Sequence, residues 1–268
     1  MKSISRGCST DKIRSPCWTA YNRAMDKTTA ETLLALNLKF YQTFASDFSE
    51  TRQRLQPGVL RLLDTLEPGI TILDLGCGNG ELARELARRE FPCTYTGVDF
   101  SAALMEEAKQ TLPADFPSRF LELNLAEEDW EPILQGEHFD VILALAVFHH
   151  LPGAELHRQV CSKIFDHLAE NGAFYLSSWQ FLKSERLRSR TQPWSKIDLH
   201  PDQVGENDYL LDWRRGGLGL RYVRYFSKGA LQQLAEDTGF EVAQTYFSDG
   251  KRGDLSIYQK WVKAHDSG

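Results

Sequence analysis

The stretch ILDLGCGNG, residues 72 to 80, places three glycines within five positions of one another, directly after an apolar run that contains Asp74. A short apolar run of this kind is typical of a buried strand, and residues 80–90 have apolar side chains at helical spacing. Glycines allow tight turns and a close approach of the backbone to a ligand. The first N–H groups of the next helix lack partners within that helix. The stretch therefore predicts a strand, a ligand-binding loop and a helix, in that order.

The same alternation of strand and helix continues along the chain. The predicted strands occupy 71–75, 93–99, 119–125, 139–148, 173–179, 240–248 and 255–263, and the predicted helices occupy 80–90, 101–112, 153–169 and 227–240. Strands that alternate with helices form a mostly parallel sheet with helices on both faces. We therefore predict a doubly wound α/β fold with a seven-stranded sheet.

The spacing of the glycines distinguishes between two kinds of nucleotide ligand. A dinucleotide site has the pattern GxGxxG, but here Gly76 and Gly78 are followed by Glu81 at the sixth position. An acid at a helix start suits a pyrophosphate poorly, whereas Asp74 suits a ligand that carries an amino group. Asp99 ends the second strand, where an acid can accept hydrogen bonds from ribose hydroxyls. The pattern indicates a nucleoside ligand with a cationic end.

Three segments resemble the seven-stranded methyltransferases that use S-adenosylmethionine: ILDLGCGNG (72–80), YTGVDFS (95–101) and FDVILALAVFHHL (139–151). The resemblance implies an enzyme with S-adenosyl-L-methionine as cofactor and an antiparallel last strand. It implies that the glycines pack against the methionine part, that Asp99 holds the ribose, and that Asn124 stands where many members have an acid at the adenine. The cofactor contacts expected from it are Asp74, Gly76, Cys77, Gly78, Asn79, Gly80, Asp99, Phe100, Asn124, Leu125 and Ala144.

The sequence pattern and the resemblance together predict one domain with an N-terminal helical extension and an insertion after the fifth strand. The expected parts are a flexible tail (1–28) and a methyltransferase domain (29–268), which consists of a helical cover (29–66), a cofactor-binding core (67–180), a substrate-recognition insertion (181–226), and the last helix with two closing strands (227–263). The insertion exceeds the usual ~2–6 residues of such a connection. We expect it to form a lid over the methyl acceptor.

A second resemblance concerns the acceptor. The segments FSETRQRLQPGV (48–59), DYLLDW (208–213) and RYVRYFSKGAL (221–231) are similar to the methyltransferases of tRNA wobble uridine, which esterify a carboxymethyl group. The chain departs from that family where LQPG replaces a Trp-Pro pair and where Val223 and Arg224 replace Tyr and His. The acceptor is therefore left open between tRNA and a small-molecule metabolite.

Several side chains suit a carboxylate acceptor. A guanidinium can hold a carboxylate through two hydrogen bonds, and the candidates are Arg52, Arg221 and Arg224. Trp179 and Trp213 can stack on a flat base. His150 follows the fourth strand and can approach the substrate or act as a base, although methylation of a carboxylate needs none. Cysteine or acidic side chains do not stand at ligand spacing beside the His149–His150 doublet, so we predict no metal.

Composition restricts the alternatives. The formal charge of −6 favours a small metabolite over RNA, whereas residues 181–228 hold 10 Lys and Arg against 6 Asp and Glu. The five cysteines are scattered, which favours free thiols and a cytoplasmic location. Apolar runs stay well below the ~20 residues of a membrane helix, so we expect no membrane contact. A non-catalytic cofactor-binding module is a third possibility, and a partner subunit is left undetermined.

Overall fold

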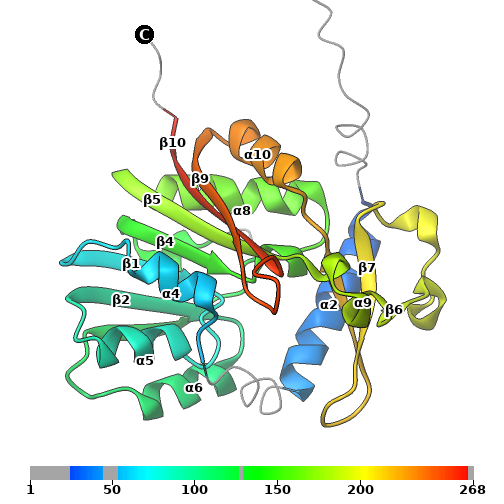
Figure 1. The fold of residues 1–268 in the computed structure, drawn as a ribbon, viewed down its shortest axis with the longest axis horizontal. Helices are drawn as coiled ribbons and strands as arrows, with labels where there is room; N and C mark the ends of the chain where they lie inside the picture. Colours follow the sequence, from blue (N-terminus) through cyan, green and yellow to red (C-terminus); the bar gives the residue numbers. More distant parts are fainter. Residues whose placement is uncertain (1–24, 45–53, 127–128, 265–268) are drawn as a thin grey trace, which may run out of the picture.

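The computed structural model describes residues 25–44, 54–126 and 129–264 of the 268-residue chain. Its main feature is a seven-stranded sheet in the order β3-β2-β1-β4-β5-β10-β9 (Figure 1). The strands are β1 (Ile70–Leu75), β2 (Cys93–Asp99), β3 (Ser118–Glu122), β4 (Phe139–Leu145), β5 (Leu168–Trp179), β9 (Phe240–Ser248) and β10 (Ser256–Lys263). The predicted fold class is confirmed.

Strand direction follows the expected pattern. The strands β3, β2, β1, β4 and β5 pair in parallel, each with its neighbour. The strand β10 lies between β5 and β9 and runs antiparallel to both. The carboxyl ends of the parallel strands therefore meet at one edge of the sheet, where open α/β sheets bind their ligands.

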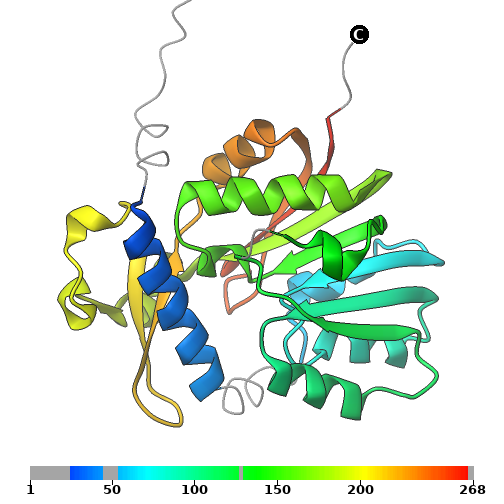
Figure 2. The same ribbon diagram turned by 180° about the vertical axis from the view of Figure 1, so that it is seen from behind.

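Helices cover both faces of this sheet, as Figures 1 and 2 show from opposite sides. The helices α4 (Pro57–Leu63) and α5 (Glu81–Arg88) pack on one face, and α8 (Ala154–His167) and α10 (Lys228–Asp237) pack on the other. Successive side chains of a strand point to opposite faces. Ile72 therefore packs in the core on the side of α4 and α5, and Leu73 packs in the core on the side of α8 and α10. The remaining helices of the core are α6 (Ala102–Thr111) and α7 (Glu131–Leu134).

Two strands are shorter than the sequence pattern predicts. The strand β3 ends at Glu122 rather than at 125, and β4 ends at Leu145 rather than at 148. Ala146 has a left-handed φ of 60°, which breaks the extended backbone. Residues Phe148–His150 then form a 3-10 helix, η1. The apolar run continues past the strand because Phe148 is buried in the core.

The segment after β5 forms a second, smaller sheet. The strands β6 (Thr191–Gln192), β7 (Asp208–Trp213) and β8 (Gly219–Arg224) pair antiparallel in that order. The other elements of the segment are α9 (Glu185–Arg188) and three 3-10 helices, η2 (Phe181–Lys183), η3 (Trp194–Ile197) and η4 (Pro201–Gln203). Sequence periodicity indicated no regular structure here.

The helix α2 (Lys27–Thr43) lies against the small sheet rather than on the large one. Asp26 caps its first turn by accepting a hydrogen bond from the Thr29 N–H at 2.9 Å. The amide of Asn37 bonds both the N–H and the C=O of Tyr222 on β8, at 2.8 and 3.2 Å. Because β8 is an edge strand, the Asn37 amide bonds the backbone groups of Tyr222 that a further strand would otherwise pair with. None of the helices in the described ranges has the length and apolar character needed to cross a membrane.

Candidate active site

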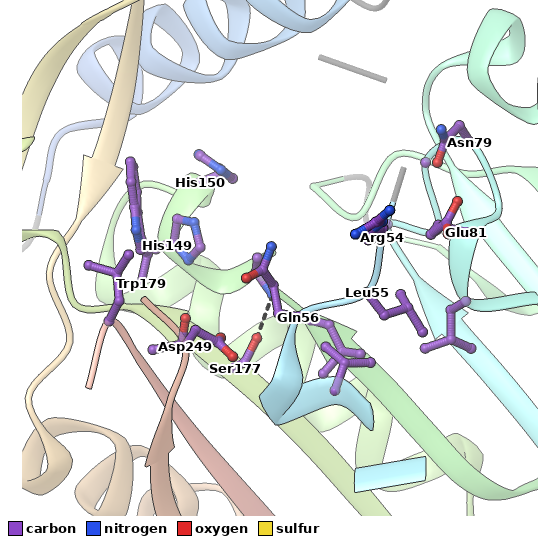
Figure 3. Close-up of a pocket in the computed structure, with 18 of the residues that line it drawn as sticks. Arg54, Leu55, Gln56, Asn79, Glu81, His149, His150, Ser177, Trp179 and Asp249 are labelled. Atoms are coloured by element: carbon purple, nitrogen blue, oxygen red, sulfur yellow. Dashed lines mark hydrogen bonds between the residues drawn. The ribbon is translucent and has the colours of Figure 1, made fainter. Parts of the chain in front are cut away.

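A pocket of about 600 Å³ lies between the carboxyl ends of the parallel strands and the small sheet. Figure 3 shows His149, His150 and Trp179 on one side of this pocket, Asn79 and Glu81 on the other, and Gln56 between them. The volume lies within the usual range of small-molecule sites. The large sheet, the segment before α4 and the insertion therefore all contribute to one cavity.

The glycine loop forms one wall of the pocket. Gly76, Gly78 and Gly80 have left-handed φ angles of 73°, 54° and 76°. A Cβ on Gly76 would lie 2.7 Å from Val147, and a Cβ on Gly80 would lie 2.7 Å from Ala108. Within 4 Å, a Cβ on Gly78 would meet no atom of the described chain. The first and third glycines are therefore needed for packing, whereas Gly78 leaves space for a ligand.

Asp99 holds this loop in place. Its two carboxylate oxygens accept hydrogen bonds from the Gly78 N–H and the Ser101 N–H, both at 2.9 Å. Asp99 is buried and does not line the pocket. Each carboxylate oxygen has a second lone pair, so a ribose contact by Asp99 stays a prediction that these backbone bonds allow.

Asp74 is a buried carboxyl group at the cofactor end of the pocket. It accepts a hydrogen bond from the Tyr95 hydroxyl at 2.6 Å. Burial, with a smaller contribution from the charge of Asp99, raises the pKa of Asp74 to about 7. A bound cation would favour the ionised form. The loop and this carboxyl group together fit a cofactor with an ammonium group.

The structure brings together only part of the predicted cofactor set. Asp74, Gly76, Cys77, Gly78 and Asn79 line the pocket. The predicted residues that do not line it are Gly80, Asp99, Phe100, Asn124, Leu125 and Ala144. Ala144 is fully buried in the core, because strand alternation turns its side chain away, and Leu145 and Ala146 line the pocket instead.

The predicted adenine contact is also placed away from the pocket. The Asn124 side chain accepts a hydrogen bond from the Ala126 N–H at 3.1 Å and so closes a local turn. Leu125 belongs to the hydrophobic core. The adenine role of Asn124 stays a prediction.

Arg221 lies in an aromatic cage at the other end of the pocket. Its guanidinium carbon lies 5.4, 5.1 and 5.7 Å from the ring centroids of Phe40, Trp179 and Trp213. These distances are those of cation–π contacts. Arg221 is only 6% exposed, yet it lines the pocket together with both tryptophans. The cage holds one positive charge in a fixed position within reach of a ligand.

His150 is engaged through both ring nitrogens. Nε2 lies 2.7 Å from the Tyr41 hydroxyl, and Nδ1 lies 3.3 Å from the Tyr222 carbonyl oxygen. A carbonyl can only accept, so Nδ1 carries the proton and Nε2 accepts from Tyr41. The side chain therefore links α2 to β8. Both nitrogens are used in this link, which disfavours the predicted alternative of a general base.

Arg224 does not share the pocket with Arg221. It is buried and donates to Asp208 at 2.7 Å, and the Tyr222 hydroxyl donates to the same carboxylate oxygen. This geometry disfavours the prediction that Arg224 holds a substrate carboxylate, since its guanidinium is buried against a carboxylate of the protein itself and does not line the pocket. Arg52 lies outside the described residues.

A comparison with known protein families identifies the family of this chain. The family described as "Methyltransferase domain" matches residues 48–245. The chain belongs to this family. Membership confirms the predicted enzyme class and the cofactor that the resemblance implied, S-adenosylmethionine.

Individual relatives are more distant. A protein of Encephalitozoon cuniculi, named as a methyltransferase, is 29% identical over 209 residues, which are 76% of this chain and 86% of that protein. The tRNA (carboxymethyluridine(34)-5-O)-methyltransferase of Schizosaccharomyces pombe is 23% identical over 76% of this chain and 88% of its own length.

Among solved structures, one neighbour belongs to the complex between the Haloferax volcanii Trm112 methyltransferase activator and a methyltransferase. It superposes with a TM-score of 0.62 at 16% identity, covering 86% of this chain and 98% of that chain. At this identity the likeness shows the fold alone.

The methyltransferase pocket also contains residues that sequence patterns did not single out. Five of them are arginines: Arg54, Arg186, Arg190, Arg214 and Arg215. The basic excess of 181–228 indicated four of these as a group but not individually. Ser177 and Asp249 complete the polar floor. No local pattern marks Asp249, which accepts hydrogen bonds from the Gly58 N–H at 2.9 Å and the Tyr258 hydroxyl at 2.7 Å.

Proposed function

We propose that this methyltransferase esterifies a carboxylate, and that the carboxylate is the carboxymethyl group of a tRNA wobble uridine. The observation that carries the proposal is Arg221 in its aromatic cage, in the same pocket as the glycine loop. A guanidinium can bind a carboxylate through two parallel hydrogen bonds. The flat faces of Trp179 and Trp213 beside it suit a base.

The chain's own residues divide the work between two ends of the pocket. S-adenosylmethionine, when bound, supplies a methyl group activated by a positively charged sulfur. Asp74 would hold the ammonium group of this cofactor, and Gly78 provides the space for it. Arg221 would orient the acceptor carboxylate, and catalysis is then mostly positioning.

A carboxylate acceptor carries no proton that must leave, so the reaction requires no general base. The engagement of both His150 nitrogens is consistent with this requirement. An amine or hydroxyl acceptor would need a proton acceptor in the pocket. His150 is then a positioning residue that joins α2, η1 and β8.

Two observations bear on which molecule carries the carboxylate. The relative from Schizosaccharomyces pombe, named for carboxymethyluridine, aligns over most of both chains and supports tRNA. The pocket volume of about 600 Å³ and the net charge of −6 support the alternative, a small carboxylate metabolite. Cys77, Cys93 and Cys161 are free thiols, which supports a reducing, cytoplasmic compartment.

We include a partner subunit in the proposal, because the Haloferax volcanii neighbour is part of a complex with an activator. The expected result is higher turnover by the enzyme co-purified with such an activator than by the enzyme alone. Equal turnover by both preparations would remove the partner from the proposal.

Mass spectrometry of nucleosides from bulk tRNA, with and without this protein, tests the acceptor. The methyl ester of carboxymethyluridine should be lost when the gene is deleted and restored by the wild-type chain. Arg221→Ala should fail to restore it while S-adenosylhomocysteine binding, measured by calorimetry, stays unchanged. Unchanged tRNA nucleosides would refute the tRNA acceptor, and full activity of Arg221→Ala would refute the carboxylate clamp.

A further inference from the structure

Five arginines besides Arg221 line the pocket. We call Arg54, Arg186, Arg190, Arg214 and Arg215 the arginine rim. All are exposed except Arg190, which is half-buried. They come from three segments: the residues before α4, the region of α9, and the tip of the β7–β8 hairpin. The rim is therefore built by the fold rather than by one run of sequence.

Three of the five rim arginines are not neutralised within the described residues. Within the described residues, the side chains of Arg54, Arg186 and Arg190 make no hydrogen bond or ion pair. Arg214 pairs with Asp212 at 2.8 Å. Like charges held close together repel one another, so a cluster of this kind favours binding of an anion with several charges.

Three acidic side chains, Asp74, Glu81 and Asp249, line the same pocket and bond residues other than the rim arginines. Glu81 pairs with Arg84 at 2.6 Å, and Asp74 and Asp249 accept hydrogen bonds from tyrosines within the protein. The hydrogen bonds and the ion pair described for these three carboxylates are therefore made with residues outside the arginine rim.

An exposed apolar side chain stands beside the rim. Leu218, at the tip of the β7–β8 hairpin, is 86% exposed. Gly216 and Gly217 have φ angles of 66° and 143° and form the turn between the two arginines, Arg214 and Arg215, and Leu218. Gly219, at the base of this tip, packs closely against Phe44, because a Cβ at this position would lie only 2.5 Å from the Phe44 ring.

This combination matches one class of partner. A single-stranded nucleic acid presents phosphates at regular intervals together with unstacked bases, whose flat faces accept apolar contacts. An acidic peptide supplies the charges without the flat faces. A free metabolite that fits the pocket would not extend to Leu218, which does not line it.

We propose that the arginine rim binds the phosphates of single-stranded RNA that flanks the nucleotide in the pocket, and that Leu218 packs against a neighbouring base. The proposal rests on the proposed tRNA acceptor but concerns binding, so it can be measured without turnover. In this proposal Arg221 binds the carboxylate of the acceptor, and the arginine rim binds the phosphates of the RNA.

The test is the fluorescence anisotropy of a labelled anticodon stem-loop RNA with the full-length chain, titrated over a series of salt concentrations. Arg186→Gln/Arg190→Gln should weaken binding about tenfold at low salt. It should also lower the slope of log affinity against log salt by about 1.4, since each lost phosphate contact on a single strand accounts for roughly 0.7. Arg188→Gln is the control, because Arg188 is exposed on α9, the helix of Arg186, but does not line the pocket.

Leu218→Ser should weaken RNA binding without changing the salt slope, because it removes an apolar contact and no charge. The RNA-binding proposal is overturned if the wild-type chain does not bind the stem-loop, if the double variant binds like Arg188→Gln, or if poly-glutamate competes as well as RNA. RNA binding through the rim, combined with unchanged tRNA nucleosides in cells, would instead refute the proposed acceptor alone. Unchanged binding of S-adenosylhomocysteine verifies that each variant is folded.

Discussion

Replacing Asn37 by alanine should destabilise the acceptor side of the enzyme. The Asn37 amide donates to the carbonyl oxygens of His150 at 2.9 Å and Tyr222 at 3.2 Å, and it accepts from the Tyr222 N–H at 2.8 Å. Asn37 is 5% exposed, so water does not readily replace these bonds in the variant.

The expected loss follows from these three bonds. A buried N–H left without a partner costs about 1–3 kcal/mol, and each of the two carbonyl bonds contributes about 0.5–1.5 kcal/mol. These contributions sum to about 2–6 kcal/mol, so we expect a loss of roughly 4 kcal/mol in the free energy of unfolding. For a chain of this size, about 2–4 °C of melting temperature corresponds to 1 kcal/mol, which gives a decrease of roughly 8–16 °C.

Thermal unfolding followed by circular dichroism measures this decrease, and Gln42→Ala, an exposed change on the same helix, is the control. The substitution also frees β8, which carries Arg221. The Michaelis constant for the acceptor should therefore rise, while the affinity for S-adenosylhomocysteine stays unchanged. A melting temperature equal to that of the control would refute the assignment of Asn37 as a brace.

Four further predictions concern Asp74, the glycine loop and the buried ion pair. The affinity for S-adenosylhomocysteine should rise with pH and level off above about pH 7, because the ligand's ammonium group needs ionised Asp74, whose pKa is raised to about 7. Calorimetry should show no such rise for Asp74→Asn. The free energy of unfolding without ligand should depend on pH in the opposite direction. The raised pKa of Asp74 stabilises the fold below the ordinary value of 3.8, and urea titrations should show that this contribution is lost as pH rises toward about 7. Gly78→Val should bind no cofactor yet remain folded by circular dichroism, since its side chain fills open space at a strain of about 1–2 kcal/mol; normal binding would show that the loop is only a turn. Arg224→Ala should lose about 3–5 kcal/mol in urea unfolding, because Asp208 is left buried without its partner, and a loss below about 1 kcal/mol would contradict the buried pair.

The large sheet could be predicted because its information is local. Apolar runs, helical spacing and the glycines at 76–80 each lie within one short segment. The small sheet has no comparable pattern: DYLLDW on β7 does not alternate, and the residues that pair with it lie 6 to 20 positions away. The contact between Asn37 and Tyr222 spans 185 positions, so no local feature of the sequence indicates it.

The two arginines on β8 show why the site was predicted only in part. Arg221 and Arg224 are separated by an odd number of positions, so a strand must direct them to opposite faces. Strand geometry therefore excludes a clamp formed by both. Which of them faces the pocket depends on how the small sheet packs against α2 and Trp179, and only the tertiary structure supplies that information.

The position of Asn37 on the open edge of β8 limits how acceptor specificity can be transplanted between relatives. If residues 181–226 alone were placed on a relative whose α2 lacks an amide at the position of Asn37, the Tyr222 N–H of the edge strand would be left buried and unsatisfied. The exchangeable unit consists of two pieces far apart in the gene, the insertion and α2. Protein engineers who wish to redirect this scaffold to a new acceptor should therefore move both pieces together.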